Sequence, residues 1–305
     1  MGGSGLVTGA AGTVPDTDSL TPLRLLREAR ILTEWRDHRR DRWLLDEAPT
    51  GDGHVVIVLP GLLTSDRATH PLRHWLEERG WDARGWQQGR NLGRLDLLDT
   101  LPELVEATAA ESGRRVSLVG WSLGGTHARW VAHQCPDAVR RVITLGSPFR
   151  IDPRDTPAWP LLSRLSGASR DDLDDEILSL VAIPPPVPTT SIASLDDGVA
   201  PPEVCTDDGP HVDRVLVRGS HLGLIRNPVV WRAIADRLAN RPGPIARHPA
   251  RRRSREHRHL LRTSPDGQGS SGATTPPSGP PADPTSEGRS DDGAGTDRPA
   301  ATSQS

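Results

Sequence analysis

The chain has 305 residues, long enough for one sizeable core, and its 37 basic and 40 acidic residues give a formal net charge of −3. This near balance provides no strong field to gather nucleic acid, so we expect no nucleic-acid partner. The sequence contains no lysine, which excludes a Schiff-base mechanism, a Ser-Lys dyad and a phosphate-binding P-loop with its usual lysine.

The two cysteines, Cys135 and Cys205, lie in no spacing typical of a zinc site, so we expect buried thiols and no metal or other cofactor. Residues 1–14 lack the basic start and the long apolar stretch of a signal peptide or a membrane span. These observations predict a cytoplasmic protein without a transmembrane segment.

The N-terminal part is expected to be flexible over residues 1–18 and then to form an amphipathic helix within residues 19–45 that packs on the domain. The second half of this helix is rich in arginine and carries Trp35 and Trp43. A peripheral contact with a membrane surface is one interpretation of that half, and a solvated helix face is the simpler one.

From residue 54 the sequence changes to short apolar runs that end at Gly or Pro and alternate with helical stretches. This pattern is typical of a parallel sheet with crossover helices, and it predicts an α/β domain over residues 19–241. The predicted strands are 54–59, 81–85, 115–119, 141–145, 187–193 and 213–217, and the clearest helices are 70–79, 101–112, 123–133 and 228–237.

Two segments break the alternation. Residues 151–186 are Pro-rich and acidic but keep many apolar side chains, which indicates an insertion that caps the domain. Residues 242–305 are first rich in Arg and His and then in Ser, Pro, Gly, Asp and Thr. Such a composition cannot bury enough apolar surface to offset the entropy of ordering, so we predict a disordered tail.

Ser122 stands in the pattern Gly120-Trp-Ser-Leu-Gly124, between a predicted strand and a predicted helix. A tight turn of this kind needs glycine on either side of its central residue, because side chains there would collide with the neighbouring strand and helix. The serine hydroxyl is then exposed, and the amide of Leu123 lies unsatisfied at the helix N-terminus. The pattern therefore predicts Ser122 as a nucleophile and Leu123 as an oxyanion donor.

A serine hydroxyl needs an imidazole within hydrogen-bond reach to act as a nucleophile at neutral pH. Two candidates, His127 and His133, lie on the helix after the turn, and we expect them to face away from the cleft or into solvent. Another, His211, precedes the last predicted strand, whereas His221 follows it, at the carboxyl edge where Ser122 also emerges. We predict His221 as the base.

The acid is expected in the loop after residues 187–193, where the sequence offers Asp196 and Asp197. We prefer Asp197, because Gly198 can adopt the positive φ that would turn the carboxylate inward. In that arrangement Asp196 would be a solvated neighbour.

A second oxyanion donor is expected in the loop after residues 54–59, where Pro60 and Gly61 make a turn. Such a donor normally lies just past the turn glycine. The amide of Leu62 is the first candidate, and the amide of Leu63 is the next.

Together these segments resemble those of lipase/esterase-like α/β-hydrolases. The resemblance covers residues 54–238 and rests on residues 59–66, 120–125 with 144–148, 194–199 and 218–223, and on the Gly-x-Asn-x-Gly loop 89–93. It implies an α/β-hydrolase fold, a triad of Ser122, Asp197 and His221, and an oxyanion hole made by Leu62 and Leu123.

We therefore expect Ser122 to attack an acyl carbonyl and form an acyl-enzyme that water hydrolyses. The apolar residues of the cap favour an acyl chain or another apolar ester as the small-molecule substrate. Acyl transfer and amide cleavage use the same triad and remain alternatives. The other alternative is a non-catalytic binding protein on the same fold, which has no need of all three residues in this order.

Overall fold

The computed structural model describes Glu34 and residues 43–156, 159–170, 172, 174–239 and 262–263. The chain divides into two units, 1–268 and 269–305, and all the described residues belong to the first. The predicted flexible start and most of the predicted N-terminal helix lie outside the described residues. So does the predicted tail, apart from residues 262 and 263. Within the N-terminal helix range, Glu34 is helical and α3 forms over Trp43–Asp46.

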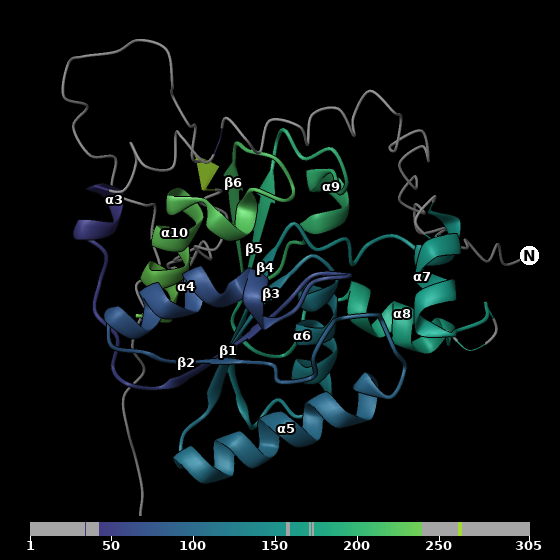
Figure 1. The fold of residues 1–305 in the computed structure, drawn as a ribbon, viewed down its shortest axis with the longest axis horizontal. Helices are drawn as coiled ribbons and strands as arrows, with labels where there is room; N and C mark the ends of the chain where they lie inside the picture. Colours follow the sequence, from purple (N-terminus) through teal and green to yellow (C-terminus); the bar gives the residue numbers. More distant parts are fainter. Residues whose placement is uncertain are drawn as a thin grey trace, which may run out of the picture. The chain divides into compact units, whose positions relative to one another are not determined.

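The described strands form one seven-stranded sheet in the order β2-β1-β3-β4-β5-β6-β7. Six of them run parallel, as predicted, and their ends lie within two residues of the predicted ends (Figure 1). They are β1 (Val55–Leu59), β2 (Asp82–Gly85), β3 (Val116–Trp121), β4 (Val139–Leu145), β5 (Thr189–Ser194) and β6 (Val212–Val217).

The sequence analysis predicts no counterpart of β7 (Arg262–Thr263), which pairs antiparallel with β6. This pairing falls inside the segment predicted as a disordered tail. Two residues are too few to carry an alternation of apolar and polar side chains, so the pattern gives no signal for such a strand.

Helices cover both faces of the sheet because the central strands are apolar on both sides. All five residues of β1 are buried, with alternate residues pointing to opposite faces. Val56 and Val58 join a core with α4 (Asp66–Glu78) and α10 (Pro228–Leu238). The other β1 residues join a second core with α5 (Leu97–Ser112) and α6 (Leu123–Gln134). Among the described helices, none is both long and apolar enough to cross a bilayer.

The predicted insertion, residues 151–186, contains η3 (Pro153–Asp155), α7 (Trp159–Ser166) and α8 (Asp175–Ala182). Buried Arg129 of α6 holds the C-terminal end of α8 by donating from Nε to the Val181 carbonyl and from Nη2 to the Ile183 carbonyl, both across 2.7 Å. Its Nη1 also lies 2.7 Å from Oδ2 of buried Asp207. The insertion is therefore fastened to the helix that begins next to Ser122.

Loops at the carboxyl edge of the sheet carry the residues of interest. Ser122 follows β3, Asp197 follows β5, and His221 follows β6, just before η4 (Leu224–Arg226). A short helix, α9 (Pro202–Cys205), lies after the Asp197 loop and buries Cys205. Because parallel strands end at one edge, three side chains far apart in the sequence can meet there.

Candidate active site

Ser122 forms the sharp turn between β3 and α6 and has φ 52° and ψ −125°. A positive φ is a strained conformation for a residue with a side chain, and strain of this kind gathers at functional sites. A Cβ at Gly120 would collide with the Cα of Gly125, and one at Gly124 would collide with the Leu59 carbonyl. Glycine is therefore required on both sides of the turn, as the sequence predicts.

The structure brings Ser122, His221 and Asp197 into one hydrogen-bonded chain. Nε2 of His221 lies 3.0 Å from Oγ of Ser122, and Nδ1 lies 2.7 Å from Oδ2 of Asp197. His221 and Asp197 are each only 4% exposed. Because water is largely excluded from this pair, the hydrogen bond between them fixes the orientation of the imidazole ring.

The two candidate acids, Asp196 and Asp197, have different hydrogen-bond partners. The Oδ1 atom of Asp197 accepts the backbone N–H groups of Val199 and Ala200, each across 2.7 Å, while its Oδ2 faces His221. Asp196 instead pairs with Arg218, whose Nη1 lies 3.0 Å from its Oδ1. The geometry thus joins Asp197 to His221.

The predicted role of Gly198 is wrong. Gly198 is not among the described residues with positive φ, so a left-handed turn does not aim the Asp197 carboxylate. The N–H groups of the next two residues, Val199 and Ala200, hold it instead. This is the usual way in which an aspartate hydrogen-bonds to its own backbone in a turn.

Two further side chains support the His221 loop. The indole Nε1 of Trp121 donates to the His221 carbonyl across 3.2 Å. The buried carboxylate of Glu34 accepts the backbone N–H of Ser220 at 2.8 Å and the Ser220 hydroxyl at 2.6 Å. Sequence reasoning missed Glu34, because a single glutamate in a helix 186 residues from its partner forms no motif.

The loop after β1 passes close to Ser122, since a Cβ at Gly61 would lie 3.2 Å from the Ser122 Cβ. The amide of Leu63 donates to the Asn91 carbonyl at 2.7 Å and is therefore occupied. The amide of Leu62 has no acceptor among the described residues. As the first residue of α6, Leu123 also has no helical acceptor for its amide. Leu62, and not Leu63, thus keeps a free donor in this loop.

Asn91, the central residue of the Gly-x-Asn-x-Gly loop, hydrogen-bonds to the loop after β1. Its Nδ2 donates to the Pro60 carbonyl at 2.8 Å, and its backbone N–H donates to the Thr64 carbonyl at 2.8 Å. Since its carbonyl also accepts from Leu63, Asn91 holds the loop after β1 at three points. Asn91 is fully buried, so these bonds are shielded from competition with water.

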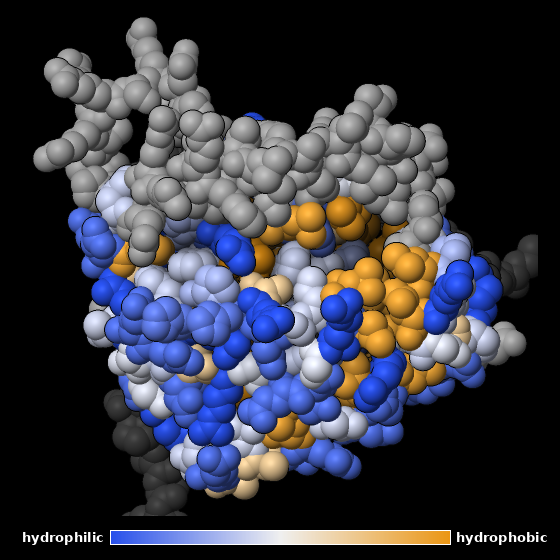
Figure 2. All heavy atoms as spheres, viewed as in Figure 1, coloured by the Kyte–Doolittle hydropathy of each residue, from blue (hydrophilic) through white to orange (hydrophobic). Residues whose placement is uncertain are grey.

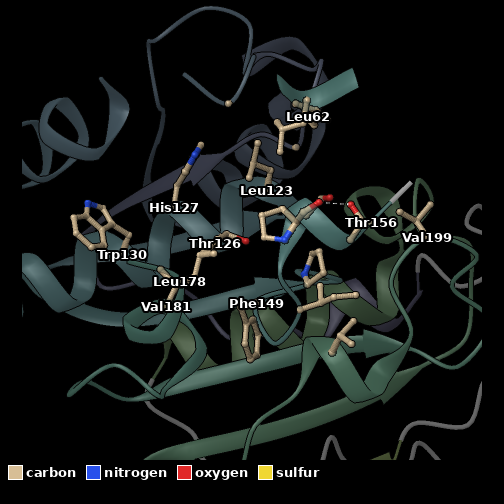
Figure 3. A pocket seen from close by; sticks show the side chains of 18 of the residues that line it. Leu62, Leu123, Thr126, His127, Trp130, Phe149, Thr156, Leu178, Val181 and Val199 are labelled. Carbon is tan, nitrogen blue, oxygen red and sulfur yellow. Dashed lines mark hydrogen bonds between the residues drawn. The ribbon is translucent and has the colours of Figure 1, made fainter. Parts of the chain in front are cut away.

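A cavity of about 400 Å³ opens beside Ser122 and His221. Figure 3 shows Leu123, Thr126, His127 and Trp130 along α6, with Leu178 and Val181 of α8 also in the wall. The wall is mainly apolar and includes Leu98, Trp130, Phe149, Leu162, Leu178 and Val181. Figure 2 shows apolar side chains gathered around α7 and α8, where Leu161 and Ile183 are exposed.

One prediction about the histidines is wrong. His127 does not face away from the cleft, because it lines the cavity and is only 7% exposed. Its ring stacks on Trp86, with centroids 6.4 Å apart and planes 13° from parallel. Burial lowers the pKa of His127 to about 4, so the ring is neutral at neutral pH. His133 lies farther along α6, where its Nε2 is 3.2 Å from the Ile183 carbonyl.

No family model matches this chain. Over 66 residues, the chain is 38% identical to a pimeloyl-[acyl-carrier protein] methyl ester esterase of Sodalis glossinidius (strain morsitans). The match covers 22% of this chain and 24% of that esterase, so it spans about a quarter of the relative's length.

Several solved structures are similar to this chain. A monoacylglycerol lipase of Paleococcus ferrophilus has 17% identity and a TM-score of 0.49, covering 64% of this chain and 97% of the lipase. The lipase BlEst2 of Bacillus licheniformis has 18% identity and a TM-score of 0.47, covering 63% and 94%. The α/β-hydrolase MGS-MChE2, from a lagoon-sediment metagenome, has 18% identity and a TM-score of 0.45, covering 63% and 92%.

The chain has the α/β-hydrolase fold that the sequence predicts. A mostly parallel sheet lies between two layers of helices, and a strained serine turn joins β3 to α6. The insertion lies between β4 and β5.

Proposed function

We propose that this protein is a serine hydrolase that cleaves an apolar ester through an acyl-enzyme. The observation that carries this proposal is the hydrogen-bonded chain from Asp197 through His221 to Ser122, which ends in the wall of an apolar cavity. Ser122 is the proposed nucleophile, His221 the base and Asp197 the acid. A structural protein has no need of a strained serine aligned with a histidine and an aspartate.

In the proposed reaction, Oγ of Ser122 attacks the acyl carbonyl carbon while Nε2 of His221 takes the hydroxyl proton. The carbonyl oxygen becomes an oxyanion, which accepts the N–H groups of Leu62 and Leu123. The carbon–oxygen ester bond then breaks, and the alcohol leaves with the proton from His221. Asp197 stabilises the imidazolium that forms in between.

The second half of the reaction repeats these steps with water as the nucleophile. His221 takes a proton from the water, whose oxygen attacks the acyl carbon of the acyl-enzyme. Collapse of the second tetrahedral intermediate returns the proton to Ser122 and releases the carboxylic acid. An alcohol that reaches the acyl-enzyme before water would give a new ester, so added alcohols separate hydrolysis from acyl transfer.

An apolar ester is favoured by the volume and lining of the cavity. About 400 Å³ lies within the range of small-molecule sites, roughly 300–1,000 Å³. The wall is built from aliphatic and aromatic side chains of α6, α7 and α8, which would receive an acyl chain. The identity with a methyl ester esterase also supports an ester as the substrate.

The test is labelling by a fluorophosphonate probe, with Ser122→Ala and Ser117→Ala as matched variants. Ser117 is the sharper control because its Oγ lies 2.8 Å from Nε2 of His54, which in turn contacts Asp52. These are the same three residue types, but Ser117 is 0% exposed and borders no part of the cavity. We expect Ser122→Ala to abolish labelling and Ser117→Ala to retain it.

Two outcomes would contradict the proposal. Labelling that survives in Ser122→Ala would move the nucleophile elsewhere. An unlabelled parent with a cooperative unfolding transition would favour a non-catalytic binding protein. The same parent should hydrolyse p-nitrophenyl esters with an optimum chain length, and Ser122→Ala should not.

A further inference from the structure

Two neighbouring polar side chains, Thr126 and His127, interrupt the apolar wall of the cavity. No hydrogen-bond partner for the Thr126 hydroxyl occurs among the described residues. The Nδ1 atom of His127 is buried without a partner, and its Nε2 contacts no acceptor or donor in the described part of the chain. Both side chains therefore retain their full hydrogen-bonding capacity.

The other polar side chains of the wall already have partners within the protein. Arg94 pairs with Asp96 across 2.6 Å, and Asp155 pairs with Arg170 across 3.2 Å, all at exposed positions. The Thr156 hydroxyl donates to the Pro153 carbonyl. Ser122 and His221 belong to the proposed catalytic chain. Thr126 and His127 thus differ from every other polar side chain that lines the cavity.

A buried polar group without a partner is costly, and native proteins seldom keep one without a reason. Catalysis as proposed above uses neither side chain. The packing of His127 also does not require its ring nitrogens, because stacking on Trp86 needs only a flat ring. A ligand group in the cavity that pairs with Nε2 of His127 and with the Thr126 hydroxyl would supply hydrogen bonds that the described residues do not.

Their place on α6 fixes where such a ligand group would lie. Thr126 and His127 come four and five residues after Ser122, which corresponds to about 6 to 7.5 Å along the helix axis. Trp130 follows at about 12 Å. An acyl chain bound to Ser122 and lying along α6 would therefore pass the two polar side chains part-way along its length.

The kind of group follows from their chemistry. The neutral imidazole of His127 offers one N–H donor and one nitrogen acceptor, and a threonine hydroxyl both donates and accepts. A hydroxyl group also donates and accepts, so it can pair with either side chain. A carboxylate can only accept hydrogen bonds, and it would leave its charge unpaired in an apolar wall.

We propose that Thr126 and His127 form a polar subsite in the acyl pocket, and that the acyl group of the substrate carries a hydroxyl part-way along its chain. This proposal rests on the proposed function, because it takes Ser122 as the point of acyl attachment. It narrows the substrate class from apolar esters in general to hydroxyacyl esters.

The experiment compares four p-nitrophenyl esters of one chain length. One is unsubstituted, and the others carry a hydroxyl next to the carbonyl, midway along the chain or on the terminal carbon. We expect the midway hydroxyl to raise kcat/KM of the parent by roughly tenfold, the scale of leaving a buried polar group unpaired. In a wholly apolar pocket the hydroxyl would instead lower kcat/KM, because it loses its water on entry.

His127→Phe removes the nitrogens but keeps a flat ring against Trp86, and Thr126→Val removes the hydroxyl with little change of shape. We expect His127→Phe to lose the preference for the midway hydroxyl, measured as the ratio of kcat/KM for the midway hydroxy ester to kcat/KM for the unsubstituted ester. Thr126→Val should weaken the same preference. Equal losses on all four esters would point to a structural role and contradict the subsite.

Calorimetric binding of the same esters to Ser122→Ala separates this proposal from the proposed function. Tighter binding of the midway hydroxy ester, with no turnover by the parent, would support the subsite and contradict the esterase function. Turnover that depends on Ser122, with no preference for that hydroxyl in either assay, would overturn the subsite and retain the function. Bound water would then satisfy the two side chains.

Discussion

The indole nitrogen of Trp121 donates to the backbone carbonyl of His221, so the residue before the candidate nucleophile holds the loop of the candidate base. The bond spans 3.2 Å and joins residues 100 positions apart. Both residues also line the cavity. The distance between the two candidate catalytic groups is therefore fixed from both sides, by the β3 turn and by the loop after β6.

Replacing Trp121 with Phe should remove this bond and keep most of the packing. We expect kcat to fall several-fold with little change of KM, because a net hydrogen bond is worth about 1 kcal/mol and the imidazole would lose alignment. Steady-state kinetics checks this. Trp75→Phe is the matched control, since Trp75 packs against Trp231 in the same core but does not line the cavity, and the variant should lose stability without losing kcat. Equal falls of kcat in both variants would contradict the role.

The two neighbouring aspartates should respond very differently to replacement by asparagine. Asp197→Asn removes the carboxylate that faces His221, and we expect kcat to fall by about 10⁴, as in other triads. Asp196→Asn breaks only a partly exposed pair with Arg218, so it should change kcat less than threefold, or about 0.6 kcal/mol. Kinetics on one ester decides between them. The reverse order would make Asp196 the acid.

Glu34 should act as a positioning residue for the His221 loop. In Glu34→Ala, the N–H and hydroxyl of Ser220 lose their acceptor, at a cost of about 1–3 kcal/mol. We expect kcat to fall about tenfold or more at a nearly constant KM, with partial rescue in Glu34→Gln, which keeps one acceptor oxygen. A loss of thermal stability with unchanged kcat would reduce Glu34 to a structural role.

Trp130 should limit the length of the acyl chain. It lines the cavity two turns beyond Ser122, and its Nε1 donates to the Leu98 carbonyl at 2.7 Å, which fixes the indole. We expect Trp130→Ala to move the optimum in a series of p-nitrophenyl esters toward longer chains, and Trp130→Phe to move it less. An unchanged optimum in Trp130→Ala would mean that the chain binds elsewhere.

The stability of the protein should depend on pH through His127. Its folded pKa of about 4 is below the unfolded value of about 6.5, so below pH 6.5 the unfolded chain binds more protons. The stabilisation from the neutral ring is thus complete above pH 6.5 and is lost as the pH falls toward 4, by about 2 kcal/mol at pH 5.

Urea unfolding at pH 7.5 and pH 5 measures this loss. His127→Phe should lose about 2 kcal/mol less than the parent between these two values. The pKa of His54 is also lowered by burial, and His54 is present in both proteins, so the difference between them isolates His127. Parallel losses in both proteins would contradict the assignment.

Much of the site could be predicted from the sequence, because the serine turn imposes steric demands that only glycine meets. The last predicted strand then distinguishes the two remaining histidines, because His211 precedes it and His221 follows it at the carboxyl edge. Glu34 could not be found this way, since its partner Ser220 is distant in sequence and only the folded chain joins them. His127 was misplaced because the sequence did not reveal that α8 packs on α6 and turns that helix face into a wall.

Arg129 ties together α6 and α8, the two helices that form much of the cavity wall. Its guanidinium joins α6 to the last carbonyls of α8, and its removal would leave Asp207 as an uncompensated charge in the interior. We therefore expect the end of α8 at Val181 to keep its place when a ligand binds. At that end we expect the protein to select its substrate by a pocket shape that is already formed, and we expect any rearrangement that admits a substrate to involve α7 rather than the end of α8.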